Sequence, residues 1–157
     1  MNWLVKKFKM RVILISVLAI LLFVKCDEDD YAPFPYIYFN VTLSISNDLL
    51  NMNIGEYKFV DGYNYGVGGL IIYRYAYSDY LAFDRACTHE AKSTCVVEDD
   101  PEFSGLMVKC PCCGSMFNVS DGFEGHFGSV FNGPAKRALM PYKTYFLQPN
   151  SLIVYNN

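Results

Sequence analysis

The chain has 157 residues, 52% of them hydrophobic and 18% charged, a length and composition that suit one globular domain behind a leader. Of its 13 Lys and Arg residues, 5 lie within the first 25 positions, so 13 minus 5 leaves 8 basic against 16 acidic residues, a net charge of −8 for the remainder. Because this remainder is acidic and has no basic run, we expect no nucleic-acid partner.

The first 25 residues have the pattern of a secretory leader. Residues 1–11 carry four positive charges and no acid, and the apolar run Val12–Val24 follows them. This run has 13 residues, fewer than the ~20 that a membrane-spanning helix needs. We therefore predict a signal peptide over residues 1–25, with a short transmembrane anchor as the alternative.

A cysteine follows the leader directly. Residues 21–26, which end in Cys26, resemble the lipidation motif of bacterial lipoproteins, although Lys25 replaces the usual small residue. The acidic tract 27–30 resembles the export signal of surface lipoproteins, and a solvated linker is its alternative interpretation. We expect lipidation of Cys26, a tether over residues 26–35, and anchoring to a membrane of the bacterial cell envelope. An outer-membrane or cell-surface location is favoured over the periplasmic face.

Short strands dominate the remaining chain. Alternating aromatic or β-branched and polar residues predict a strand over residues 36–46. Turn residues then separate further predicted strands at 57–60, 70–75, 80–83, 105–109, 115–119, 143–147 and 151–155, with 70–75 and 80–83 paired as a hairpin. No internal repeat or amphipathic helix is apparent after the leader. This pattern predicts an antiparallel all-β sandwich or barrel.

Two short segments each offer a pair of soft metal ligands. Cys87 and His89 form a C-x-H element, and Cys110 and Cys113 lie at the ends of the sequence CPCC. Such side chains bind zinc or the iron of iron–sulfur clusters. Five cysteines remain beside Cys26, an odd number, so they cannot all form disulfides with one another. A disulfide scaffold is the main alternative, but it gives no role to His89.

These segments resemble the two cluster loops of Rieske [2Fe-2S] domains. Residues 83–90 resemble the first loop, and residues 108–117 resemble the second, with Cys113 in the position of the family's second His. Residues 133–142 (GPAKRALMPY) resemble the segment that packs over the cluster. The resemblance covers about residues 57–157. It implies a Rieske-like antiparallel β fold for the domain 36–157, with a small cluster-binding subdomain over about 84–135.

The resemblance also implies a ligand set. Cys87 and Cys110 would bind the inner iron of the cluster, and His89 and Cys113 would occupy the positions that bind the outer iron. A thiolate in place of a neutral imidazole adds one negative charge. The potential would therefore fall between about −150 to +300 mV for Rieske centres and about −400 mV for plant-type ferredoxins.

Further roles come from the same resemblance. Cys112 matches a non-ligand cysteine that pairs with the first loop in some members, which implies a Cys95–Cys112 disulfide. Pairing of Cys95 with Cys110 or Cys113 is the competing arrangement and would leave no cluster. Ser115 matches a serine that donates a hydrogen bond to a cluster sulfur.

The sequence thus favours a lipid-anchored electron-transfer module with one [2Fe-2S] cluster and a redox protein partner. Zinc is the alternative cofactor, because Cys87, His89, Cys110 and Cys113 also form a Cys3His set. The alternative function is a surface lipoprotein whose β domain is stapled by zinc or disulfides and serves binding or structure. A free-standing enzyme is less favoured, since no catalytic set can be assembled. His126 is expected to be a solvated loop residue.

Overall fold

The computed structural model describes residue 3 and the ranges 34–120 and 127–156, and the chain divides into two compact units, residues 1–31 and 32–157. Trp3 is the described residue of the first unit, and it is exposed. The rest of the predicted leader, Cys26 and the acidic tract 27–30 lie outside the described residues. In the described ranges no helix has the length and apolar character needed to cross a membrane.

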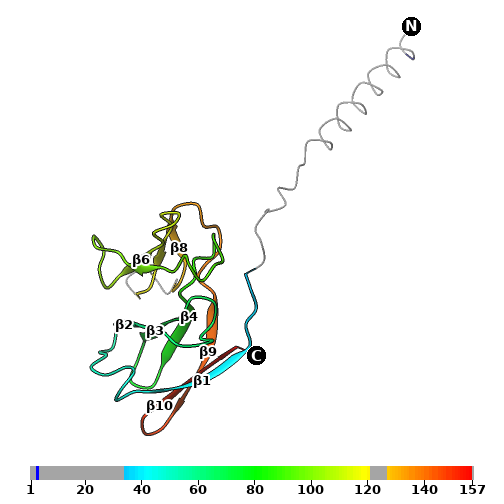
Figure 1. Cartoon of the computed structure of the whole chain (residues 1–157). Helices are drawn as coiled ribbons and strands as arrows, with labels where there is room; N and C mark the ends of the chain where they lie inside the picture. The colour runs from blue at the N-terminus through cyan, green and yellow to red at the C-terminus, as the bar shows by residue number, and fades with distance from the viewer. Residues whose placement is uncertain (1–2, 4–33, 121–126, 157) are drawn as a thin grey trace. The chain divides into compact units, whose positions relative to one another are not determined.

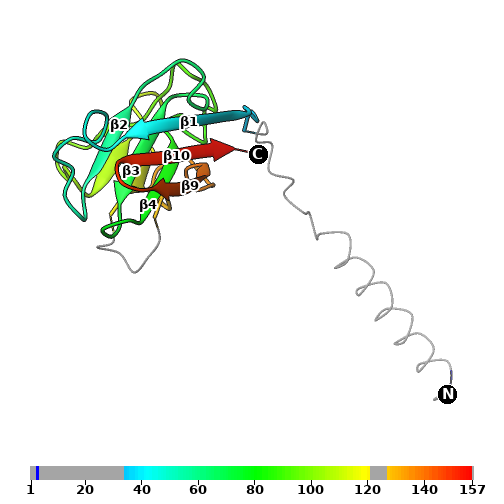
Figure 2. The same ribbon diagram turned by 90° about the horizontal axis from the view of Figure 1, so that it is seen from below.

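The second unit is built from two antiparallel sheets (Figure 1). The larger sheet has six strands in the order β1-β10-β9-β4-β3-β2, which Figure 2 shows from below. Its strands are β1 (Phe39–Ser44), β2 (Tyr57–Val60), β3 (Leu70–Arg74), β4 (Tyr80–Asp84), β9 (Pro141–Leu147) and β10 (Ser151–Asn156). The smaller sheet, in the order β5-β6-β7-β8, has strands β5 (Glu98–Asp99), β6 (Met107–Lys109), β7 (Met116–Asn118) and β8 (Val130–Asn132). The prediction of an all-β antiparallel fold is confirmed.

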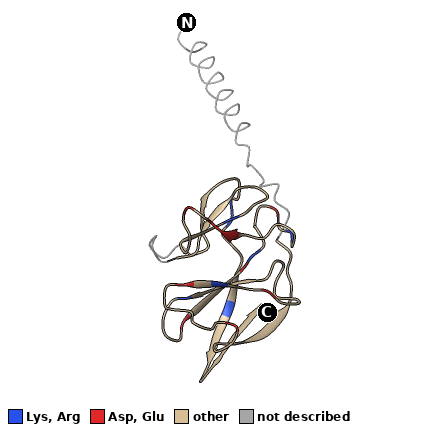
Figure 3. Ribbon diagram, turned by 60° about the vertical axis from the view of Figure 1, so that its left-hand side comes forward, with Lys and Arg blue, Asp and Glu red and all other residues tan. Residues whose placement is uncertain are grey.

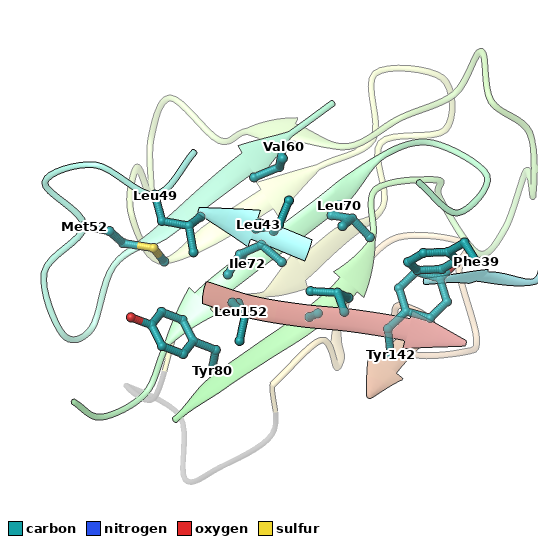
Figure 4. Packing of buried hydrophobic residues seen from close by; sticks show 12 residues of the cluster. Phe39, Leu43, Leu49, Met52, Val60, Leu70, Ile72, Tyr80, Tyr142 and Leu152 are labelled. Atoms are coloured by element: carbon teal, nitrogen blue, oxygen red, sulfur yellow. The ribbon is translucent and has the colours of Figure 1, made fainter. Parts of the chain in front are cut away.

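The larger sheet encloses the first of two hydrophobic clusters. Alternate residues of its strands point to one face, as the period of two requires. Leu43 of β1 and Leu152 of β10 lie opposite each other in register and are both buried. They pack in one cluster with Leu70 and Ile72 of β3 (Figure 4). Because strands from both halves of the sheet contribute to this cluster, the sheet curls around it.

Strands β3 and β4 are buried on both faces. Ile72 faces the first cluster, while its neighbour Ile71 and the paired Phe83 belong to a second cluster with Val108 and Phe117 of the smaller sheet. A strand covered on both sides needs a continuous apolar run, which residues 70–73 (LIIY) supply. The β3–β4 hairpin therefore forms the wall between the two clusters, and the predicted hairpin is confirmed.

Two strands of the smaller sheet were not predicted. Strand β5 consists of two exposed acidic residues, drawn in red in Figure 3, and carries no hydrophobic pattern. Strand β8 pairs irregularly with β7, since the register shifts between Met116 and Phe117. Elsewhere in Figure 3, acidic and basic residues are interspersed among the uncharged ones.

Candidate metal centre

Three cysteine side chains converge at the end of the domain that carries the two predicted ligand loops. The Sγ atoms of Cys87, Cys110 and Cys113 all lie within 4.8 Å of one another. Those of Cys87 and Cys113 are 3.6 Å apart. Cys87 follows β4 of the larger sheet, whereas Cys110 and Cys113 lie between β6 and β7 of the smaller one. Segments that follow strands of both sheets therefore bring thiols to one point.

The two ligand loops repeat the same backbone arrangement. The carbonyl of Cys87 accepts a hydrogen bond from the N–H of Ala91 at 2.7 Å, and that of Cys110 accepts one from Gly114 at 2.8 Å, four residues later in both cases. Both closing residues have positive φ, 50° at Ala91 and 76° at Gly114. Glycine adopts this conformation without steric cost, while alanine in the same role is strained.

The repeat extends to the sulfur atoms. Sγ of Cys87 accepts hydrogen bonds from the backbone N–H groups of residues 89 and 90, and Sγ of Cys110 accepts them from residues 112 and 113. In both loops the donors are therefore the second and third residues after the cysteine. N–H donors aimed at a sulfur stabilise its thiolate, which is the form that binds a metal. Both loops thus present two backbone N–H groups to a cysteine sulfur, which would favour the thiolate form of that cysteine.

Burial and hydrogen bonding act in opposite directions on the three thiols. Burial raises the pKa of Cys87 and of Cys110 above the usual thiol value, despite the N–H donors. Burial also acts to raise the pKa of Cys113, but the Ser115 hydroxyl and N–H and the neighbouring thiols outweigh it, so that this pKa is lowered. A bound cation would supply the charge that the buried pair needs to ionise.

The segment after β8 connects the two loops. The N–H of Ala135 donates to Oγ of Ser115 at 2.9 Å, and Oγ1 of Thr88 donates to the carbonyl of Arg137 at 2.6 Å. Ser115 Oγ also lies 3.1 Å from Cys113 Sγ. The segment expected to pack over the site therefore contacts both ligand loops. Thr88 was not singled out from the sequence, where a threonine between two ligands carries no distinct signal.

Replacing Ser115 with alanine is expected to destabilise this junction. Ser115 is fully buried, so its loss leaves the N–H of Ala135 without its acceptor. We expect the free energy of unfolding of the metal-free domain to fall by about 1–3 kcal/mol, measured by urea denaturation. Ser93→Ala is the control, because Ser93 is exposed, and its effect should stay within about 0.5 kcal/mol. Equal stability of the two variants would show that the Ser115–Ala135 hydrogen bond is dispensable.

A disulfide also joins the two loops. It links Cys95, at the end of the first loop, to Cys112 in the second, with Cα atoms 5.8 Å apart. This is the pairing that the family resemblance implied. It leaves Cys87, Cys110 and Cys113 as free thiols.

Of the two histidines, His89 is among the described residues. His89 is partly buried, and its backbone N–H donates to Cys87. Among the described residues, the set of mutually close ligand atoms consists of the three sulfurs and does not include the His89 ring, so ligation by His89 stays a prediction. His126, like Cys26, lies outside the described residues.

One buried acid near the first loop was also not singled out. Asp84, the last residue of β4, is fully buried and accepts four hydrogen bonds. Its one sequence signal is its position, directly after the apolar residues 80–83 (YLAF). An acid at the end of a strand usually marks a solvated turn, so this signal gave no reason to expect burial.

No protein-family model matches the chain, and the search of curated proteins gives no match. Solved structures with a similar fold include the following two. A chain from the complex of reduced oxygenase and oxidized ferredoxin in carbazole 1,9a-dioxygenase has a TM-score of 0.42 and 19% identity, over 72% of this chain and 99% of that one. A putative NADH-dependent nitrite reductase small subunit from Mycobacterium tuberculosis has a TM-score of 0.42 and 17% identity, over 78% of this chain and 98% of that one. Neither likeness assigns a function to this chain.

Proposed function

We propose that this protein is an electron-transfer module whose two loops hold one [2Fe-2S] cluster. The observation that carries the proposal is that three free thiols, Cys87, Cys110 and Cys113, meet at one site although their loops follow strands of different sheets. Three soft ligands with aimed N–H donors suit iron–sulfur iron or zinc. His89 is the fourth ligand of the proposal, because it is the remaining soft ligand in the first loop.

The surrounding residues would control the behaviour of the cluster. Cys87 and Cys110 are fully buried and would keep water from one side of it, whereas Cys113 is partly exposed and would face the partner. When bound, such a cluster accepts and donates one electron. Backbone N–H groups directed at Cys87 and Cys110 would stabilise the added negative charge.

The substitution Cys113→His tests the assigned role of Cys113. An imidazole is neutral, so the variant should keep the cluster and have a higher reduction potential. From the ranges of four-Cys and two-His clusters, the expected increase is on the order of 100–350 mV. A redox titration followed in the visible spectrum measures it. Cys113→Ser is the control and should lose the cluster. A His variant without iron, or with a lower potential, would contradict the assignment.

A single zinc ion is the second candidate, and one distance favours it. Ligands of one tetrahedral zinc with Zn–S bonds of about 2.3 Å lie about 3.8 Å apart. The 3.6 Å between the sulfurs of Cys87 and Cys113 is close to that value. These two cysteines would bind different irons of a cluster, so the Cys113 side chain would have to turn away from Cys87. The protein would then have a structural role or bind a partner through its β domain.

Metal and acid-labile sulfide analysis of protein purified without oxygen distinguishes the two candidates. Two irons and two sulfides per chain with visible colour would support the cluster. One zinc without sulfide would support the structural role. Because oxidation of the thiols would mimic an empty site, the thiols of Cys87, Cys110 and Cys113 are titrated in the same sample.

The cellular setting is part of the proposal. We propose lipid attachment through Cys26 and a location in the bacterial envelope, supported by the basic and apolar leader and the acidic tract after it. A redox protein is the proposed partner. Labelling of cells with a radioactive fatty acid, compared between the natural chain and Cys26→Ala, tests the anchor.

A further inference from the structure

Asp84 is a fully buried carboxylate three residues before Cys87. Its Oδ2 accepts hydrogen bonds from the N–H of Val67 at 2.6 Å and from the hydroxyl of Tyr142 at 2.5 Å. Its Oδ1 accepts them from the N–H of Gly68 at 2.9 Å and of Ala86 at 2.7 Å. Burial of a charge is costly unless donors replace water, and four donors do so here.

The loop over residues 66–69 is fitted closely around this carboxylate. A Cβ atom on Gly66 would lie 2.3 Å from Asp84 Oδ2, and one on Gly68 would lie 2.6 Å from the backbone nitrogen of Ala86. Side chains at these two positions would therefore push the loop off the acid. The glycines allow backbone N–H groups to approach Asp84 where any larger residue would block them.

Asp84 also controls the direction in which the chain leaves β4. Its hydrogen bond to the N–H of Ala86 turns the backbone immediately before Cys87. Next to it, Ala86 forms a β-bridge with Val96, and the N–H of Cys87 donates to the carbonyl of Cys95 at 2.9 Å. The base of the first ligand loop is thus fixed to Asp84 on one side and to the disulfide cysteine Cys95 on the other.

We propose that Asp84 is a positioning residue for the metal centre, which sets the location of the Cys87 sulfur by fixing the base of the first ligand loop. This inference rests on the proposed metal-binding function. An asparagine of the same size could not replace Asp84, because its NH2 group would face donors instead of accepting from them. Tyr142 keeps its proton for this role, since burial and the Asp84 carboxylate raise its pKa.

The test compares three variants in the metal-loaded protein. Asp84→Asn alters the acid, and Tyr142→Phe removes one of its four donors while keeping the ring packed edge-on against Phe39. Asp79→Asn is the matched control, because Asp79 is exposed just before the other end of β4. The readout is the rate at which EDTA removes the bound metal, followed by metal analysis, beside thermal unfolding of the metal-free forms.

We expect Asp84→Asn to lose metal at least 10-fold faster than the natural chain, Tyr142→Phe to lose it severalfold faster, and Asp79→Asn to match the natural chain within twofold. If Asp84→Asn does not fold, Tyr142→Phe decides. If the deciding variant, Asp84→Asn or else Tyr142→Phe, lost metal as slowly as Asp79→Asn, the inference would be overturned, even if the metal-free form of that variant were less stable. A natural chain that takes up neither iron nor zinc would overturn the proposed function as well, so the two failures are distinguishable.

Discussion

Replacing Cys110 with serine should lower the metal affinity about 60- to 700-fold. Cys110 is fully buried, and its sulfur is one of the three that converge. Structural zinc binding releases about 10–16 kcal/mol, so one ligand of four accounts for about 2.5–4 kcal/mol, and every 1.4 kcal/mol is tenfold. The serine hydroxyl is a hard, protonated group and a poor substitute for thiolate. Competition with a chromogenic chelator measures the change.

The matched control makes the same substitution, cysteine to serine, at a cysteine outside the three converging sulfurs. Cys112→Ser, combined with Cys95→Ala so that neither partner of the disulfide is left as an unpaired thiol, removes two cysteines that are joined to each other. This double variant should lose about tenfold in metal affinity, much less than Cys110→Ser, because the disulfide supports the loops but supplies no ligand. Retention of full affinity by Cys110→Ser would show that the convergent thiols do not form the site.

The same double variant should be less stable by about 3 kcal/mol. The disulfide closes a loop with a sequence separation of 17, and its removal restores the conformational freedom of that loop to the unfolded chain. Urea denaturation of the metal-free protein, natural and variant, measures the difference in the free energy of unfolding. A reductant should reproduce the loss in the natural chain and change nothing in the variant.

One outcome would argue for a different pairing. If Cys95→Ala alone increased metal binding by the protein while Cys112→Ser did not, Cys95 would be paired with one of the ligand cysteines, which the substitution releases. The proposed site would then be wrong in its first assumption, that Cys87, Cys110 and Cys113 are free thiols.

The positions of most strands along the chain could be predicted, because the longer strands show their burial in the pattern of apolar residues. The run LIIY at residues 70–73 is buried on both faces, and the predicted bounds of β2 match the structure. Strands β5 and β8 could not be predicted, because two or three residues without alternation leave no periodic signal. These two strands form by pairing with β6 and β7, and their own residues do not show that pairing.

Of the site, only the candidate ligand side chains could be predicted from the sequence. The short spacing from Cys87 to His89 and from Cys110 to Cys113 identified the loops, since soft ligands so close in sequence can face one centre. The backbone donors could not be predicted, because any residue has an N–H and only the turn geometry aims it at sulfur. Asp84 was missed for a related reason, since its partners come from three separate segments that meet in the folded chain.

The origin of the two loops in different sheets has a mechanical consequence. The first loop extends from the wall hairpin of the larger sheet, and the second from the hairpin β6–β7 of the smaller one. A metal ion or cluster bound by both loops would link the two sheets, in addition to the covalent link of the disulfide. Metal supply would then decide whether the two sheets unfold together or one after the other.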